Sequence, residues 1–560
     1  MKKSYISVPL FAIILSGCAF VPIGTSTNSS SNTQPSQTSN NTSQGLSNDS
    51  NVSSTSENVS YDPLEPGMEM YNGFTYPSGA QTSATAAYYE FWHPETRIVL
   101  DISASSDIFT KMDENGYSDS IYQDLYWPVN VTITVNDTAH TFEEVGMRRK
   151  GNTSRGYYFL EEGRVSDVFS FKLSFKEVWD EDIYQQFGIK KSWLPTDAEY
   201  IARDNRQFLA DENGKNGLAK IDIKMYKTND ESMINQAFAF SLFQKGGLIS
   251  PNSTLGKIRM TSGNNNSDFG VVAINETIDK QLLRRYFSKA DAKGDLYKVG
   301  WGVGANNQWN KGNLSIEEYN AYPAMIGEED KLIGYSPRYD AKEFDDKKEV
   351  PHQNLINLMQ ALKQNEGKSV SEYLANLEAV VDIDSFLNYA ALSYLTGNQD
   401  DMRNNGNNYY IYFNPGQNNK AYFIPYDYDW ALGLGFSEDG GLTMAKISPF
   451  HSKLQGNDRN WQDNRLFLYT IVNNKQGFDI TTNPTWQQTY YDKLINYIAG
   501  DFFTLARFND MYARYRNTYK NDTNVLSLHS NEVYNNFGGT HLFAEYIDFM
   551  INSVESNPLS

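Results

Sequence analysis

Acidic and amide side chains gather in one stretch of the sequence, and their order could support phosphoryl transfer. Asp400 opens a polar loop, Asn408 ends it, and Asp427 and Asp429 follow a later aromatic segment. Transfer of a phosphoryl group from a nucleotide needs a carboxylate beside the attacking hydroxyl and oxygen ligands on a divalent metal ion. The stretch therefore predicts a base, Asp400, and a metal site formed by an Asn and an Asp.

The same stretch allows other interpretations. Asp and Asn are frequent in turns, and two nearby carboxylates could bind a structural Ca²⁺ or form the acid pair of a glycosidase. Asp401 is a rival for the base, and Asn404 and Asn405 are rivals for the metal ligand. The sequence contains no G-x-S-x-G or H-E-x-x-H motif, which argues against a serine hydrolase of that type and a zinc peptidase.

A second polar segment lies upstream, between two predicted strands. There the backbone of Gly151 and Asn152 and the hydroxyl of Ser154 could contact phosphate oxygens. Lys172, on the next predicted strand, could pair with nucleotide phosphates, and Glu276 could hold Lys172 by an ion pair. Each feature also has a plain interpretation: an ordinary turn, a solvated strand lysine, and a carboxylate near a helix N-terminus.

The elements that must position these residues change along the chain from strands to helices, which predicts an α+β fold. Alternating apolar residues predict strands at 97–102, 129–135, 142–149 and 169–175. Helical spacing predicts helices at 232–245, 355–364, 370–377, 383–395 and over most of 486–550. Two short aromatic strands around Tyr410 and Phe423 would carry the acidic residues.

Composition and charge restrict the class of protein. The chain has 560 residues, of which 40% are hydrophobic, enough for a large core in one two-lobed unit or two domains. The net charge of −20 argues against a nucleic-acid partner, because such binding needs clustered Lys and Arg. ATP can still bind an acidic protein if Mg²⁺ or Mn²⁺ screens its phosphates.

The N-terminal residues predict export and lipid attachment. Two lysines precede a short apolar run, and residues 15–18 read Leu-Ser-Gly-Cys, which matches a bacterial lipobox. We expect residues 1–17 to be a signal peptide and Cys18 to carry acyl chains, which would anchor the protein on the extracytoplasmic face of a bacterial membrane. An ordinary secretory signal is the alternative. Residues 18–83, rich in Ser, Asn and Thr, would form a disordered tether. With a single cysteine, no intramolecular disulfide is possible.

Taken together, these segments resemble the spore coat protein H (CotH) kinase family, whose members are exported atypical protein kinases. The resemblance covers roughly residues 97–450. It rests on motifs in this order: Arg149-x-Gly151-Asn152-x-Ser154, Phe169-Ser170-Phe171-Lys172-Leu173, Asp230-Glu231-Ser232-Met233-Ile234, Phe269-Gly270-Val271-Val272-Ala273-Ile274-Asn275-Glu276, Gly294-Asp295-Leu296-Tyr297-Lys298, Gly397-Asn398-Gln399-Asp400, Asn408-Tyr409-Tyr410-Ile411-Tyr412 and Pro425-Tyr426-Asp427-Tyr428-Asp429.

The resemblance implies a bilobal, protein-kinase-like fold. A β-rich lobe over 84–300 would carry the nucleotide loop, and an α-rich lobe over 301–560 would carry the catalytic hairpin.

The resemblance also implies roles for single residues, which are expectations here. The loop of Gly151, Asn152 and Ser154 would cover the phosphates of ATP, and Lys172, steadied by Glu276, would contact them. Asp400 would orient or deprotonate a Ser or Thr hydroxyl of an exported protein. Asn408, with Asp427 or Asp429, would hold Mg²⁺ or Mn²⁺. The alternatives are an inactive relative that serves in surface binding, assembly or adhesion, and a carbohydrate-active enzyme.

Overall fold

The computed structural model describes the greater part of the chain after residue 85. It covers residues 86–116, 125–151, 170–224, 230, 232–303, 309–330, 335–344, 350–363, 369–434, 448–450, 483–522, 532–534 and 540–559. All of them belong to one compact unit, Ser60–Ser560. The predicted signal peptide, the lipidation site at Cys18, the predicted tether, and Asn152 and Ser154 of the predicted phosphate loop lie outside the described residues.

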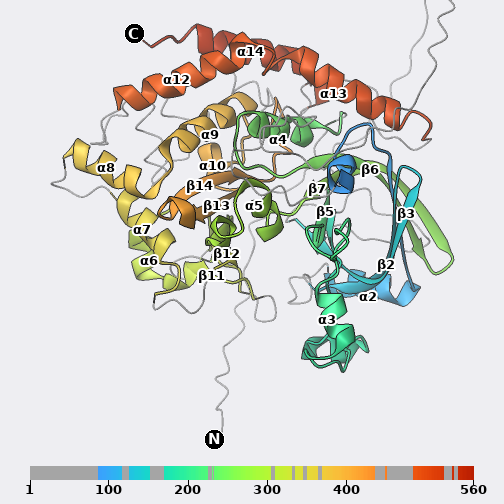
Figure 1. Ribbon diagram of the computed structural model, residues 1–560. Coiled ribbons are helices and arrows are strands. Elements are labelled where there is room, and N and C mark those ends of the chain that lie inside the picture. The colour runs from blue at the N-terminus through green and yellow to red at the C-terminus, as the bar shows by residue number, and fades with distance from the viewer. Residues whose placement is uncertain are drawn as a thin grey trace, which may run out of the picture. The chain divides into compact units, whose positions relative to one another are not determined.

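Seven strands form a closed barrel (Figure 1). Their order is β1-β2-β3-β4-β5-β7-β6, and the parallel pair β1–β6 closes the barrel while the other neighbours are antiparallel. Alternate residues of β2 are buried, and the barrel interior is an apolar core. The strands are β1 (Ile98–Ala104), β2 (Trp127–Val135), β3 (Thr138–Lys150), β4 (Ser170–Ser174), β5 (Lys220–Lys224), β6 (Ser253–Ser262) and β7 (Asn265–Glu276).

A separate five-stranded sheet carries the acidic hairpin. Its order is β11-β12-β8-β13-β14, with β13 and β14 as the predicted aromatic hairpin. Strands from both sides of residue 300, the predicted boundary between lobes, take part in this one sheet. The strands are β8 (Leu296–Val299), β11 (Ile326–Gly327), β12 (Tyr339–Glu343), β13 (Tyr409–Asn414) and β14 (Lys420–Pro425). Two smaller pairs join β9 (Gly302–Val303) to β10 (Trp309–Asn310) and β15 (Glu532–Tyr534) to β16 (Thr540–Leu542).

The helices confirm the α+β class. Those predicted from the sequence are α4 (Asn235–Lys245), α7 (Gln353–Leu362), α8 (Val370–Val380), α9 (Ile383–Thr396), α12 (Pro484–Ala499), α13 (Leu505–Thr518) and α14 (Phe543–Glu555). The other described α-helices are α1 (Ala86–Phe91), α2 (Ser106–Gly116), α3 (Ala198–Asp204), α5 (Lys280–Tyr286), α6 (Ile316–Ala321) and α10 (Met402–Asn405). Among the described residues, no helix combines the length and the apolar character needed to cross a membrane.

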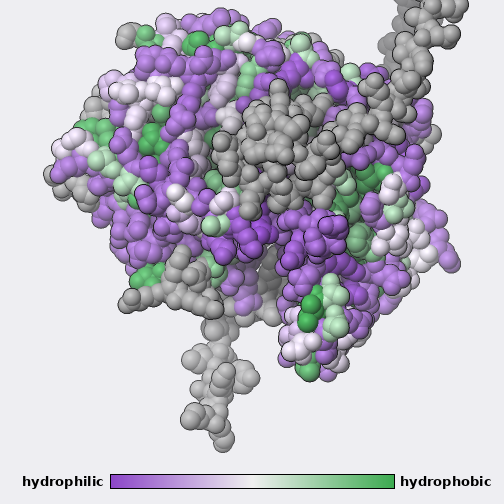
Figure 2. All heavy atoms as spheres, in the orientation of Figure 1, coloured by the Kyte–Doolittle hydropathy of each residue, from purple (hydrophilic) through white to green (hydrophobic). Residues whose placement is uncertain are grey.

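The C-terminal helices pack on the barrel as well as on the other helices. Figure 1 shows α12, α14 and α13 along one side of the molecule, with α13 toward the barrel. The hydroxyl of Tyr519, just after α13, donates to the carbonyl of Leu255 in β6 at 2.7 Å. The next turn places Asp522 against Arg97 and Lys257 of the barrel. The face shown in Figure 2 is largely hydrophilic, with scattered apolar side chains, as expected of a water-exposed surface.

Candidate functional site

A buried amide ties the Asp400 loop to the end of the acidic hairpin. Helix α9 ends at Gly397, whose φ of 57° lets the chain turn out of the helix. Asn398 follows and is fully buried; its Oδ1 accepts from the backbone N–H of Asp400 at 3.1 Å, and its Nδ2 donates to the carbonyl of Asp427 at 3.2 Å. One side chain therefore fixes two predicted site residues, from separate segments, next to each other.

Three amides surround the carboxylate of Asp400. The short helix α10 folds the intervening loop back, so that Asn405 Nδ2 donates to Oδ1 at 2.5 Å and Asn407 and Asn408 donate to Oδ2 at 3.2 and 2.9 Å. Burial raises the pKa of Asp400, and the charge of Asp427 adds to this, while the three amides oppose it. The structure thus brings Asp400 and Asn408 together, as the sequence predicted.

The neighbouring Asp401 faces the protein core. Its side chain is fully buried, and its Oδ2 accepts hydrogen bonds from the hydroxyls of Ser393 and Tyr428. A carboxylate enclosed by a helix side chain and a core tyrosine cannot reach a substrate hydroxyl. Of the two candidates for the base, only Asp400 lies at the amide cluster.

Lys311 fixes the orientation of the Asn405 amide. Lys311 Nζ lies 3.2 Å from Asn405 Oδ1. An ammonium group can only donate, so the amide oxygen faces Lys311 and the amide nitrogen faces Asp400. The Asn405 oxygen is therefore engaged, which weakens Asn405 as a rival metal ligand. Within the part of the chain that the structure describes, Asn408 bonds to Asp400 through its nitrogen, and its oxygen could therefore face a metal ion. The side chain of Asn404 lies outside what the structure describes.

Asp427 and Asp429 share one cation, the ammonium of Lys224 at the end of β5. Lys224 Nζ contacts Asp427 Oδ1 and lies 3.0 Å from Asp429 Oδ2. Burial lowers the pKa of Lys224, but the two carboxylates outweigh it and leave that pKa raised. Burial and the like charge of Asp427 raise the pKa of Asp429 to about 7 despite Lys224. Asp429 is buried, whereas the side chain of Asp427 is one-third exposed. The two carboxylates carry two negative charges and face one ammonium group, so a divalent cation could bind them without creating excess positive charge.

The donor set of this pair suits Mg²⁺ or Mn²⁺. Both metals prefer hard oxygen ligands, and the pair offers carboxylates from Asp427 and Asp429 with the amide oxygen of Asn408 nearby. Asp400 lies close enough to raise the pKa of Asp429 by its charge. Among the described residues, no group of three or more His, Cys, Asp or Glu side chains is arranged to hold a metal. A divalent ion bound here would therefore need the amide oxygen of Asn408 and further oxygens from a bound ligand or water.

Lys172 projects from β4 and pairs with a carboxylate that sequence reasoning did not single out. Its Nζ lies 3.2 Å from Asp222 Oδ1, and Lys150 Nζ lies 2.5 Å from the other oxygen of Asp222. Burial holds the pKa of Lys172 well below its usual value, although Asp222 opposes this shift. Gly151, directly after Lys150, has φ 89°, a conformation that favours glycine.

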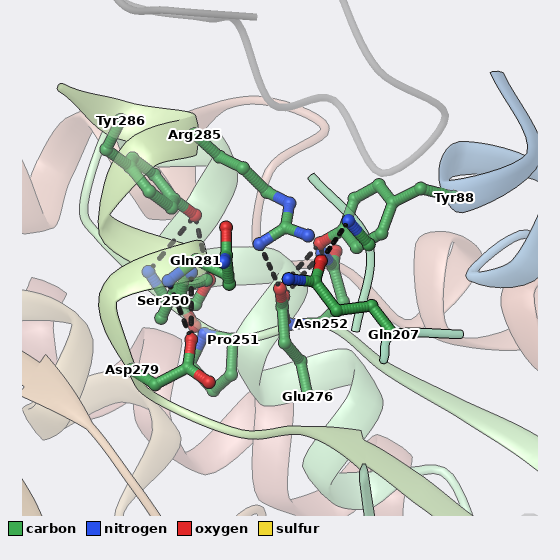
Figure 3. Close-up of polar contacts among 12 residues, drawn as sticks. Tyr88, Gln207, Ser250, Pro251, Asn252, Glu276, Asp279, Gln281, Arg285 and Tyr286 are labelled. Carbon is green, nitrogen blue, oxygen red and sulfur yellow. Dashed lines mark hydrogen bonds and ion pairs between the residues drawn. The ribbon is translucent and has the colours of Figure 1, made fainter. Parts of the chain in front are cut away.

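The predicted ion pair between Lys172 and Glu276 is not formed. Glu276 Oε1 lies 2.9 Å from Arg285 Nη1 and accepts from the hydroxyl of Tyr88 at 2.8 Å, while its Oε2 accepts from Asn252 Nδ2 at 2.9 Å (Figure 3). Burial raises the pKa of Glu276, against the attraction of Arg285.

Strand register gives the physical reason for this difference. Lys172 is opposite Asp222 across β4 and β5, whereas Glu276 is opposite the next residue, Ile221. Adjacent residues of a strand point to opposite faces. The two side chains therefore lie on different faces of the barrel wall. Nor does Glu276 cap the following helix α5, because Asp279 accepts from the first N–H groups of that helix.

The site thus contains residues to which sequence reasoning gave no role, although it quoted Lys298 and Asn398 within motifs: Lys150, Asp222, Lys224, Lys298, Lys311 and Asn398. One signal was available, because the alternation of the segment Lys-Ile-Asp-Ile-Lys at 220–224 places Asp222 and Lys224 on the same face of a strand. The contacts of Asn398 and Lys311 join segments distant in sequence and carry no such local pattern.

Comparison with known proteins identifies the family. The profile of the CotH kinase protein family matches residues 225–549, which is more than half of the chain. This chain belongs to the CotH kinase protein family. The matched range includes Glu276, Asp400, Asn408, Asp427 and Asp429; it starts one residue after Lys224 and does not include Gly151 or Lys172.

One similar characterised protein is Invasin CotH3 of Rhizopus delemar. It is 31% identical to this chain over 75 residues, which are 13% of this chain and 12% of the invasin. The chain therefore matches only a small part of that CotH protein's length.

Proposed function

We propose that this CotH protein is a bilobal atypical protein kinase that transfers the γ-phosphoryl group of ATP to a Ser or Thr hydroxyl of an exported protein. The observation that carries the proposal is the convergence of Asp400, Asn408, Asp427 and Asp429 at one place, joined by Asn398 and faced by Lys224. Phosphoryl transfer needs this combination of a carboxylate for the acceptor, oxygen ligands and a cation.

In the proposed reaction the acceptor oxygen forms a bond to the γ-phosphorus while the bond from that phosphorus to the β–γ bridging oxygen breaks. ADP leaves, and the hydroxyl proton passes to Asp400. The amides of Asn405, Asn407 and Asn408 hold the Asp400 carboxylate in place, so that little reorganisation is needed when the hydroxyl arrives.

Asp427, Asp429 and the oxygen of Asn408 would hold Mg²⁺ or Mn²⁺. A bound divalent ion would neutralise charge on the phosphates. Lys224 now compensates the same two carboxylates. With those carboxylates engaged by a metal, Lys224 would be available to the phosphates, which is the role of the strand lysine in protein kinases.

The order of elements supports this role for Lys224. Gly151 begins the connection between β3 and β4, and β5 with Lys224 follows, then α4. Protein kinases likewise have a glycine-rich loop near their first strands, a phosphate-binding lysine on the third strand, and helix C carrying its partner glutamate. Here α4 contains no acidic residue, so the partners of Lys224 are the two aspartates. Lys172 stays a predicted phosphate contact, paired to Asp222.

The cellular setting of the proposal comes from the sequence. A signal peptide ending at residue 17 and acylation of Cys18 would place the kinase on the extracytoplasmic face of a bacterial membrane, with residues 18–83 as tether. Its substrates would then be exported proteins.

The test is metal-dependent transfer of label from γ-³²P-ATP by the purified full-length chain, to itself or to casein. Lys224→Met and Asp427→Asn should each abolish the transfer. Lys420→Met, which removes a lysine from the far end of the hairpin, should leave it unchanged. Transfer that survives in both site variants would overturn the proposed assignment.

A second function, surface binding without catalysis, is favoured by one observation: the similar protein of Rhizopus delemar is named an invasin. Melting of the full-length protein with and without ATP and Mn²⁺ separates the two proposals. A kinase should gain stability from ATP with Mn²⁺ together, because ligands of the folded state raise the melting temperature. A binder that has no nucleotide site should show no change.

A further inference from the structure

Lys298 lies at this site and has no carboxylate partner among the described residues. It lies on β8, and its Nζ is 4.9 Å from the ring centre of Tyr426. Lys150 Nζ lies 5.2 Å from the same ring centre. Tyr426 directly precedes Asp427, so two ammonium groups, one from the barrel and one from the five-stranded sheet, meet beside the acidic pair.

Three other lysines near this site, Lys150, Lys172 and Lys224, have carboxylate partners that neutralise their charge. Lys150 and Lys172 share Asp222, and Lys224 bonds to Asp427 and Asp429. Lys298 is opposite Asp340 across the sheet, but that carboxylate bonds to Lys342.

An uncompensated ammonium in this position is costly. Burial lowers the pKa of Lys298, and the like charges of Lys342 and Lys150 lower it further, although Glu329 and Asp340 oppose them. The face of Tyr426 offers only a weak attraction to a cation. A bound anion would remove both the desolvation cost and the repulsion between Lys150 and Lys298.

We propose that Lys298 and Lys150 form a polyphosphate-binding pair beside Tyr426, and that Lys298 makes the site specific for a chain of three linked phosphate groups. The inference deepens the proposed kinase function and rests on it for the nucleotide. A metal on Asp427 and Asp429 would also free Lys224, so three cations would face one polyanion. Such a site distinguishes tripolyphosphate and nucleoside triphosphates from singly charged anions.

The experiment measures binding of Mn²⁺ with ATP, and separately Mn²⁺ with inorganic tripolyphosphate, to the full-length protein by titration calorimetry. Lys298→Met should weaken both by about tenfold or more, as expected for loss of a charge-assisted hydrogen bond. Lys298→Arg should recover most of the loss, because a cation remains. Lys420→Met, on β14 of the same sheet, serves as the matched control and should bind as the unmodified protein does.

Thermal melting supplies a second, independent measurement. Without ligand, Lys298→Met should melt at the same or a higher temperature, because the change removes a partly buried ammonium group that the neighbouring lysines repel. With Mn²⁺ and tripolyphosphate, its melting temperature should rise less than that of the unmodified protein. A lysine that merely supports the fold would lower the melting temperature in both conditions.

The outcomes separate the inference from the function beneath it. Unchanged tripolyphosphate affinity in Lys298→Met overturns the inference and leaves the kinase proposal in place. If the unmodified protein binds tripolyphosphate but not ATP, the anion site is supported and the proposal that the site takes ATP is overturned. Binding of neither overturns both.

Discussion

Asp400 and Asp401 are adjacent in sequence and have opposite environments. Asp400 sits among three side-chain amides at the site, whereas Asp401 is enclosed by Ser393 and Tyr428. Asp400→Asn should lower the rate of phosphoryl transfer by about 10²–10⁴-fold with little change in melting temperature, because it removes a proton acceptor of the same shape.

Asp401→Ala should show the reverse pattern. The hydroxyls of Ser393 and Tyr428 would lose their buried acceptor, at a cost of about 1–3 kcal/mol in the free energy of unfolding. Urea denaturation of both variants, alongside the transfer assay, checks this assignment. Loss of activity without loss of stability in Asp401→Ala would reverse the roles of the two carboxylates.

Lys311 offers a test of how Asp400 is positioned. Without the ammonium, the Asn405 amide can rotate and present its oxygen to Asp400. Lys311→Met should therefore lower kcat by about tenfold with little change in the KM for ATP. Lys311→Arg restores a donor and should recover activity. A KM effect of similar size would place Lys311 at the nucleotide instead.

The ion pairs of Asp222 predict how the stability of the protein depends on pH. Burial raises its pKa, but Lys150 and Lys172 outweigh this and hold it below the usual value. A carboxyl whose pKa is lower in the folded state stabilises the protein above its unfolded pKa of about 4, and this contribution disappears as the pH falls through its folded pKa.

Asp222→Asn should accordingly cost about 3–5 kcal/mol at pH 7, because two buried ammonium groups lose their counter-charge. The difference in melting temperature between the variant and the unmodified protein should narrow from pH 7 to pH 3. A difference in melting temperature that stays constant from pH 7 to pH 3 would show that the charge of Asp222 is not its source.

The candidate residues themselves could be predicted where their signal was local. Asp400, Asn408, Asp427 and Asp429 stand out as polar residues at the ends of aromatic strands, and the structure brings them together. The predicted partner of Lys172 was wrong because an ion pair depends on which face of the barrel each residue occupies, and one residue of register decides that.

At the scale of elements, the turn after α9 positions the whole loop. Gly397 has φ 57°, and its N–H donates to the carbonyl of Ser393 at 3.0 Å. A β-branched residue is strained in this conformation by about 1–2 kcal/mol, whereas Asn tolerates it. Gly397→Val should lower both stability and transfer rate. Gly397→Asn should retain most of each, as circular dichroism melts and the labelling assay would show.

Several of the long elements were predictable for a physical reason, although the long strands β6 and β7 were not predicted. Apolar and polar residues alternate along strands β1 to β4, and apolar residues recur at helical spacing in α9, α12 and α13. Each of these segments therefore shows the sequence period of its own secondary structure. The short strands β8, β11 and β12 were missed because two to five residues carry too little pattern. Their pairing in one sheet with β13 is a long-range arrangement that no local segment specifies.

At the scale of the whole molecule, one carboxylate of the C-terminal segment holds two cations of the barrel. Asp522 Oδ1 lies 2.9 Å from Arg97 Nη2 and 3.1 Å from Lys257 Nζ, and its side chain is 7% exposed. Asp522→Ala should cost about 1–3 kcal/mol, because the nearly buried Lys257 loses an acceptor.

Asp510, on the preceding helix α13, is the matched control. It bonds to Arg514 at 2.9 Å, but its side chain is 61% exposed. Asp510→Ala should change stability by no more than about 0.5 kcal/mol. Amide hydrogen exchange in β1 and β6 should accelerate only in the Asp522 variant. Equal effects of the two changes would show that the loss of one negative charge, and not the specific contacts of Asp522, lowers the stability.

The closing pair of the barrel also sets a limit on when the domain can fold. Strand β1 ends at Ala104, yet its parallel partner β6 runs to Ser262, so the chain must be made well past the first strand before the ring can close. Pairings between distant strands form slowly. Until then β1 is an open edge that can pair with another nascent chain. Newly made molecules at high density should therefore aggregate through this strand, and a chaperone that covers extended apolar segments should relieve the aggregation.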